Sequence, residues 1–183
     1  MLKRARIFIE DKEWEKACEY AEYALDVDAG CAEAYLAKFM AEYNISQEEY
    51  IPKFCSDMIA EIDSLFDITT YNKASRFGDE ELNKKLTEYN NGAIYNYADH
   101  RMHYVNPDDN ASKQYYDTEK IFKRISGFKD SDKKAQECLN KAKEHEENAK
   151  KRVEKLREEN YNNAVKFMEV AQKRTEPIIQ KKY

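Results

Sequence analysis

The sequence predicts an all-α protein whose chain ends in one long helix. Glycine occurs only 4 times and proline only 3 times in 183 residues, which leaves few turns for a multi-stranded β fold. Apolar residues recur at steps of three and four along most of the chain, as they do on the inner face of a helix. Residues 132–174 contain neither glycine nor proline. These observations together predict helices that are joined by short turns.

The first 43 residues predict three helices, at 2–10, 13–27 and 32–43. Each has apolar side chains at helical spacing, and Gly30 lies where the second helix would end in a residue with positive φ. The inner-face residues are Ala5, Phe8 and Ile9 in the first helix, Trp14, Ala17, Ala21, Ala24 and Leu25 in the second, and Tyr35, Leu36, Phe39 and Met40 in the third.

The next segment predicts one helix from Ser46 to Leu65 and a shorter one after it. Ser46 can cap the longer helix, because Glu49 stands three residues later and completes a capping box. A short helix is expected at 69–77, and Gly78 would end it.

Residues 79–127 predict at least two helices. Asp79 can cap a helix that begins at residue 80. The sequence NNG at 90–92 leaves open whether that helix ends there or continues to about residue 104. The sequence NPDDN at 106–110 predicts a turn, and a helix is expected from there to Ile125, closed by Gly127.

The last segment predicts one long helix over 132–174, with Pro177 kinking or ending it. Its middle carries only Val153 and Leu156 as large aliphatic residues, so much of it should face solvent. The sequence AVKFMEVA at 164–171 is an apolar face that needs a partner. Folding back onto the body and pairing with another chain in a coiled coil or homodimer both remain open.

Charge and composition argue against several classes of protein. Residues 1–130 hold 17 basic and 26 acidic residues, and residues 131–183 hold 14 and 10, which gives the net charge of −5. An acidic body with a mildly basic tail is not typical of a nucleic-acid-binding protein. No signal peptide and no apolar run of about 20 residues is present, so a cytoplasmic protein without a membrane span is expected. The four cysteines should be free thiols.

No catalytic motif stands out, and no enzyme activity or cofactor is expected. The sequence contains no Gly-rich phosphate loop, GxSxG, HExxH or Cys–His signature. His100 and His103 share a helix face and are the candidates for zinc ligands, together with Cys138. Packing and hydrogen bonding on a tyrosine-rich helix explain both histidines better, so no metal site is predicted.

Residues 2–37 resemble the tetratricopeptide repeat (TPR) family. Trp14, Ala17, Ala21 and Ala24 followed by a turn and Ala32 have the spacing of that family's second helix and the start of the next repeat. Residues 71–77 and 115–125 are weaker echoes, the latter followed by FKDS as in degenerate repeats of bacterial proteins. The resemblance implies antiparallel helix pairs that stack into a superhelix or bundle.

The resemblance also implies a groove that binds another protein. The groove positions hold Leu2, Arg6, Leu36 and Met40, so the Lys/Asn clamp that captures a peptide carboxylate is missing. Apolar contacts with a peptide or helix are expected instead, although the same residues can simply belong to the core. The predicted contact residues are Phe8, Tyr35, Phe39 and Met40 in the body, and Phe167 and Met168 in the tail.

We therefore expect a non-catalytic adaptor or scaffold with a TPR-like domain at 1–130 and a long charged helix at 131–183. Two alternatives remain. One is a regulator or inhibitor linked to nucleic acid, in which the basic C-terminal helix touches phosphates. The other is a fragment of a larger repeat protein.

Overall fold

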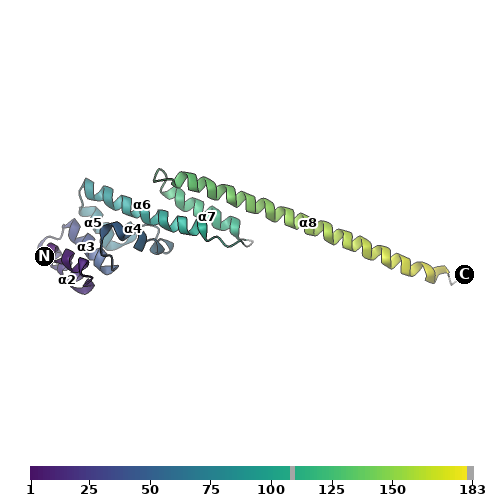
Figure 1. Ribbon diagram of the computed structural model, residues 1–183, viewed down its shortest axis with the longest axis horizontal. Helices are drawn as coiled ribbons and strands as arrows, with labels where there is room; N and C mark the ends of the chain where they lie inside the picture. The colour runs from purple at the N-terminus through teal and green to yellow at the C-terminus, as the bar shows by residue number, and fades with distance from the viewer. Residues whose placement is uncertain (108–109, 181–183) are drawn as a thin grey trace.

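The computed structural model describes the backbone of residues 1–107 and 110–180, and the side chains of that part through Ala171. The described residues form α-helices and short 3-10 turns with no β-strand, which confirms the all-α prediction. Figure 1 shows an elongated molecule, with a helical body at the N-terminal end and one long helix at the other. The elements are α1 (Leu2–Glu10), α2 (Trp14–Val27), α3 (Ala32–Glu42), η1 (Glu48–Tyr50), α4 (Ile51–Phe54), η2 (Asp57–Ala60), η3 (Leu65–Asp67), α5 (Thr69–Phe77), α6 (Glu80–His103), α7 (Ala111–Arg124) and α8 (Ser131–Gln180).

The first three helices pack closely because small residues lie where they meet. Ala5 of α1 and Ala17 and Ala21 of α2 are completely buried, and side chains of this size let helix axes approach each other. The turn between α1 and α2 contains Lys12 at φ 59°. Gly30 does not adopt the positive φ that the sequence predicted. Instead, the side chain of Asp28 accepts a hydrogen bond from the backbone N–H of Gly30 at 2.9 Å.

The prediction of one helix from Ser46 to Leu65 is wrong. The segment forms the short elements η1, α4, η2 and η3, so that its buried residues can follow the surface of α6 rather than a single helical face. Pro52 has no N–H for a helical hydrogen bond, and the hydroxyl of Ser56 donates to the Lys53 carbonyl at 2.8 Å in competition with the backbone. The residues that reach the core are Ile51, Cys55, Ile59 and Leu65.

Helix α6 runs without interruption through the sequence NNG at 90–92. Of the two alternatives that the sequence left open, the longer helix is therefore correct, and it ends at His103. Asp79 caps the helix as predicted, accepting from the backbone N–H of Leu82 at 2.8 Å. Asn90 faces inward, and its Oδ1 accepts from the backbone N–H of Leu65 at 2.8 Å. Gly92 lies against Pro52, where an added Cβ would come within 2.9 Å of the proline ring. The polar and small residues therefore serve tertiary packing and do not break the helix.

Helices α7 and α8 form a hairpin closed by Gly127, which has a φ of +83°. The predicted domain boundary at residue 130/131 coincides with the start of α8, but the first turns of α8 pack on α7 and belong to the body. Ala135, Cys138 and Ala142 are buried there. Beyond this hairpin α8 projects from the body, as Figure 1 shows, and does not fold back. It continues past Pro177 to Gln180, so the proline does not end it.

The four cysteines are free thiols, as predicted. Cys18 and Cys31 are half-buried, whereas Cys55 and Cys138 lie in the core. Burial raises the pKa of the Cys55 thiol to about 12, which keeps it protonated at neutral pH. Within the described part of the chain, no helix combines the length and the apolar composition that crossing a bilayer requires.

Candidate functional site

A cleft of about 540 Å³ opens between α1, α3, the segment that leads into η1, and α6. Its floor is apolar and is formed by Ile9, Leu36, Ala37 and Met40, which are buried except for a small part of each side chain that faces the cleft. Its rim is polar, and most rim residues are charged. This combination of an apolar floor with a few polar groups around it is typical of a binding pocket. We call it the acidic cleft; its rim residues are Arg6, Glu10, Glu33, Ser46, Gln47, Glu48, Glu49, Lys85 and Tyr89.

The rim carries more negative than positive charge. Four glutamates face two basic residues, and one of those basic residues is already neutralised. Lys85 on α6 forms an ion pair with Glu48 at 2.7 Å, and the hydrogen bond from Lys85 to Glu48 raises the pKa of Lys85. Partial burial raises the pKa of Tyr89, whose hydroxyl donates to Glu48 at 3.5 Å. No ion pair joins Glu10, Glu33 or Glu49 to another described residue, and Glu33 accepts only a weak hydrogen bond from the Cys31 thiol at 3.8 Å. These carboxylates therefore remain available to a cationic ligand.

The acidic cleft includes residues that the TPR resemblance assigned to a groove. Arg6, Leu36 and Met40, three of the four expected groove positions, all line it. Met40 is the one predicted contact residue that does so, and it forms part of the floor. Leu2 is not among the lining residues.

The other contact residues predicted for the body lie elsewhere. Phe8 packs on Tyr20 of α2, with ring centroids 5.2 Å apart. Tyr35 stacks on Phe77 of α5 at 5.7 Å and lines a separate hollow on the other side of α3. Phe39 is completely buried, so it belongs to the core and cannot touch a partner. The sequence pattern identified apolar faces of helices but could not separate core residues from surface residues.

The tail residues singled out by the sequence are largely exposed. Phe167 is 80% exposed, and Met168 is exposed as well. Both belong to α8, whose C-terminal part projects beyond α7 (Figure 1). They are far from the acidic cleft along the molecule, so the contact residues predicted for the body and for the tail lie on separate surfaces.

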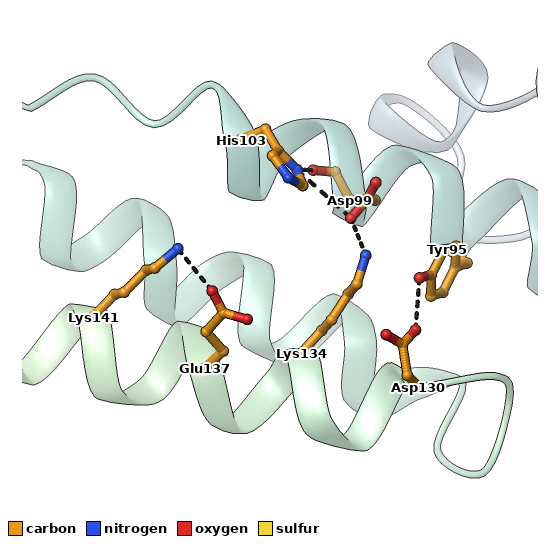
Figure 2. A network of polar contacts seen from close by, with 7 residues as sticks. All are labelled: Tyr95, Asp99, His103, Asp130, Lys134, Glu137 and Lys141. Carbon is orange, nitrogen blue, oxygen red and sulfur yellow. Dashed lines mark hydrogen bonds and ion pairs between the residues drawn. The ribbon is translucent and has the colours of Figure 1, made fainter.

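A polar junction fixes the direction in which α8 leaves the body (Figure 2). Lys134 of α8 forms an ion pair with Asp99 of α6, and the Tyr95 hydroxyl donates to Asp130 at 2.6 Å. Burial opposes the charge on Lys134, but its hydrogen bonds to Asp99 and Tyr95 outweigh burial and raise the pKa of Lys134. The Lys134 ammonium also lies 4.8 Å from the centre of the Tyr95 ring. These contacts stabilise the α6–α8 interface and hold the base of the projecting helix.

The two candidate zinc ligands take part in ordinary packing and hydrogen bonding. Nδ1 of His103 lies 2.8 Å from the Asp99 carbonyl oxygen, as Figure 2 shows. The His100 ring stacks on Tyr104 with centroids 4.5 Å apart. Cys138 is buried between α7 and α8. Among the residues that the structure describes, no three histidine, cysteine, aspartate or glutamate side chains gather as a metal site would require.

Several residues of the acidic cleft were not predicted from the sequence. Glu10 and Glu33 could have been found, because they lie one helical turn from the groove positions Arg6 and Leu36. Glu48, Lys85 and Tyr89 could not, since they reach the cleft only through the packing of α6 and of the irregular segment before it. No family model, no curated protein and no solved structure matches the chain.

Proposed function

We propose that the protein is a non-catalytic, TPR-like interaction module whose acidic cleft binds a basic segment of another protein. The observation that carries the proposal is the combination of an apolar floor with rim carboxylates that form no ion pair with another described residue, those of Glu10, Glu33 and Glu49. An amphipathic peptide or helix would place apolar side chains on Ile9, Leu36 and Met40. Its lysine or arginine side chains would then reach Glu10, Glu33 and Glu49.

The cleft is suited to binding more than to chemical catalysis. Its titratable groups are mostly exposed carboxylates and a paired lysine, whereas the three histidines stand on α6 and α8, outside the cleft. The cleft is built on helices that a continuous core holds together, so little ordering is required when a partner binds. In this proposal the body is the receptor and α8 is a spacer that carries a second contact.

The proposal predicts which peptides the protein selects. A random-peptide library presented to the immobilised wild-type chain should be enriched in peptides with net positive charge and two or three apolar residues. The Glu33→Lys variant should then bind a selected peptide at least about tenfold more weakly, since one charge-assisted contact contributes roughly 1.5–3 kcal/mol. Isothermal titration calorimetry of both proteins measures this difference.

Glu88→Lys is the matched control. Glu88 lies on α6 and is exposed, but it does not line the cleft, so the same change of charge should alter the affinity by less than about threefold. Equal losses from both variants would show a general charge effect and would contradict a specific cleft. Selection of acidic peptides, or steeply salt-dependent retention of nucleic acid in place of peptide, would also overturn the proposal.

A further inference from the structure

The projecting part of α8 has one side that is both apolar and basic. Phe167 is 80% exposed and Val170 is 49% exposed, and Lys166 is exposed beside them. Val170 follows Lys166 by four residues and Phe167 by three, so the three residues share one side of the helix. In the sequence, Lys173 and Arg174 follow Val170 by three and four residues. We call these five residues the tail face.

The charge of this segment is opposite to that of the acidic cleft. Residues 160–183 hold five basic and two acidic residues. One of the acidic residues, Glu169, is two positions from Phe167 and therefore lies on another side of the helix. The rim of the acidic cleft holds four glutamates and two basic residues, and one of the basic residues is paired with a glutamate. The tail face thus has the composition that the proposed function expects of a ligand.

We propose that the tail face of one copy of this chain occupies the acidic cleft of a second copy. Phe167 and Val170 lie on the apolar floor of that cleft in this arrangement. The three basic residues of the tail face then reach the rim carboxylates of Glu10, Glu33 and Glu49, which form no ion pair with another described residue. The inference rests on the proposed function, because it uses the same cleft and names one ligand for it.

The cleft that a tail face reaches must belong to another copy. Helix α8 is continuous from Ser131 to Gln180, and Figure 1 shows its end and the helices α2 and α3 at opposite ends of the molecule. Ala142 is the last buried residue of α8 among those described, and Lys166 lies roughly 36 Å beyond it at the helical rise of about 1.5 Å per residue. Residues 132–174 contain neither glycine nor proline, so the helix has no break at which it could turn back.

A contact of this kind joins two unlike surfaces, so it is heterologous. Each copy carries one tail face and one acidic cleft, and a copy that has donated its tail can still receive another. The contact therefore recruits further copies until a ring closes. It also competes with any other ligand of the cleft, so the apparent affinity for that ligand should fall as the protein concentration rises.

Two variants, each defective in one of the two surfaces, test the inference by sedimentation equilibrium of the full chain. The weight-average mass of the wild type should rise above that of the monomer as the concentration increases. Glu33→Lys and Phe167→Glu should each weaken self-association at least about tenfold, because one reverses a rim charge and the other replaces an apolar contact by a carboxylate. A mixture of the two variants should form a 1:1 complex and no larger species, since one supplies an intact tail face and the other an intact cleft.

Met168→Glu is the matched control for the tail variant. Met168 is exposed next to Phe167, but it is two residues from both Lys166 and Val170 and so lies on the other side of the helix. The same substitution there should change the association constant by less than about threefold. Equal losses from Met168→Glu and Phe167→Glu would show a general charge effect and would contradict the tail face.

Other outcomes would also overturn the inference. A wild-type chain that stays monomeric up to hundreds of micromolar would show that the tail does not enter the cleft. Self-association that Glu33→Lys leaves unchanged would show that the cleft takes no part in it. If selected basic peptides still bind the cleft and Glu33→Lys weakens them, the proposed function stands and only this inference fails. If those peptides do not bind either, both fail.

Discussion

Replacement of Phe39 by alanine should lower the free energy of unfolding of the helical body by about 3–5 kcal/mol, the usual range for removing a buried phenylalanine ring. Phe39 is 0% exposed and packs on Tyr71 and Tyr43, with ring centroids 5.0 Å away in each case. It connects α3 to α5, so its loss leaves a cavity at the centre of the body. Urea denaturation followed by the fluorescence of Trp14, the single tryptophan, measures the change.

Phe167→Ala is the matched control for this prediction. The sequence predicts a contact role for both phenylalanines, but Phe167 is 80% exposed on the projecting helix. Its replacement should change the Trp14 transition by less than about 0.5 kcal/mol. Equal effects of the two substitutions, or a Phe39→Ala variant as stable as the wild type, would contradict the position of Phe39 in the core.

Asn90→Ala should destabilise the body by about 2–3 kcal/mol, because a buried acceptor that serves two donors is lost. Oδ1 of Asn90 accepts from the Leu65 backbone N–H at 2.8 Å and from the Ser64 hydroxyl at 2.9 Å. Leu65 is completely buried, so water cannot easily replace the missing partner of its N–H. The same urea titration measures the loss.

The neighbouring asparagine provides the control for Asn90. Asn91 makes one long contact, accepting from the Asn90 side chain at 3.4 Å, so Asn91→Ala should cost no more than about 0.5 kcal/mol. Limited proteolysis should also show faster cleavage within residues 46–67 in Asn90→Ala, since Asn90 attaches that segment to α6. Unchanged stability of Asn90→Ala would show that these hydrogen bonds are not formed in solution.

Most helices could be predicted from the sequence because their signals are local. Helices α1, α2, α5 and α7 have one apolar face each, and α3 is apolar around most of its circumference. Asp79 stands where α6 begins, and Gly127 stands in the turn after α7. The segment from residue 46 to 67 could not be predicted, since its apolar residues suit a helix as well as they suit short turns lying on α6. The sequence NNG remained ambiguous because the roles of Asn90 and Gly92 depend on Leu65 and Pro52, which are distant in the sequence.

The candidate site was predictable only in part, for the same reason. The repeat-like spacing led to Arg6, Leu36 and Met40, which do line the acidic cleft. It could not show that Lys85 and Glu48 meet across the cleft, because no local pattern connects residues so far apart in the chain. Nor could it show that Phe39 lies in the core whereas Met40, the next residue on α3, lines the cleft. The direction of the C-terminal helix was also undecided, because it depends on the contacts of Lys134 and Asp130 with α6.

Methyl NMR of the wild-type chain tests the proposed binding function most directly. The chain would be titrated with a basic, apolar peptide selected from a library, and the methyl signals of the isoleucine, leucine and methionine residues followed. Binding of the peptide in the acidic cleft predicts that the largest shifts occur at Ile9, Leu36 and Met40, which lie on its floor. Shifts centred instead on Ile68, in the hollow on the other side of α3, or on Leu156 of the tail would contradict it.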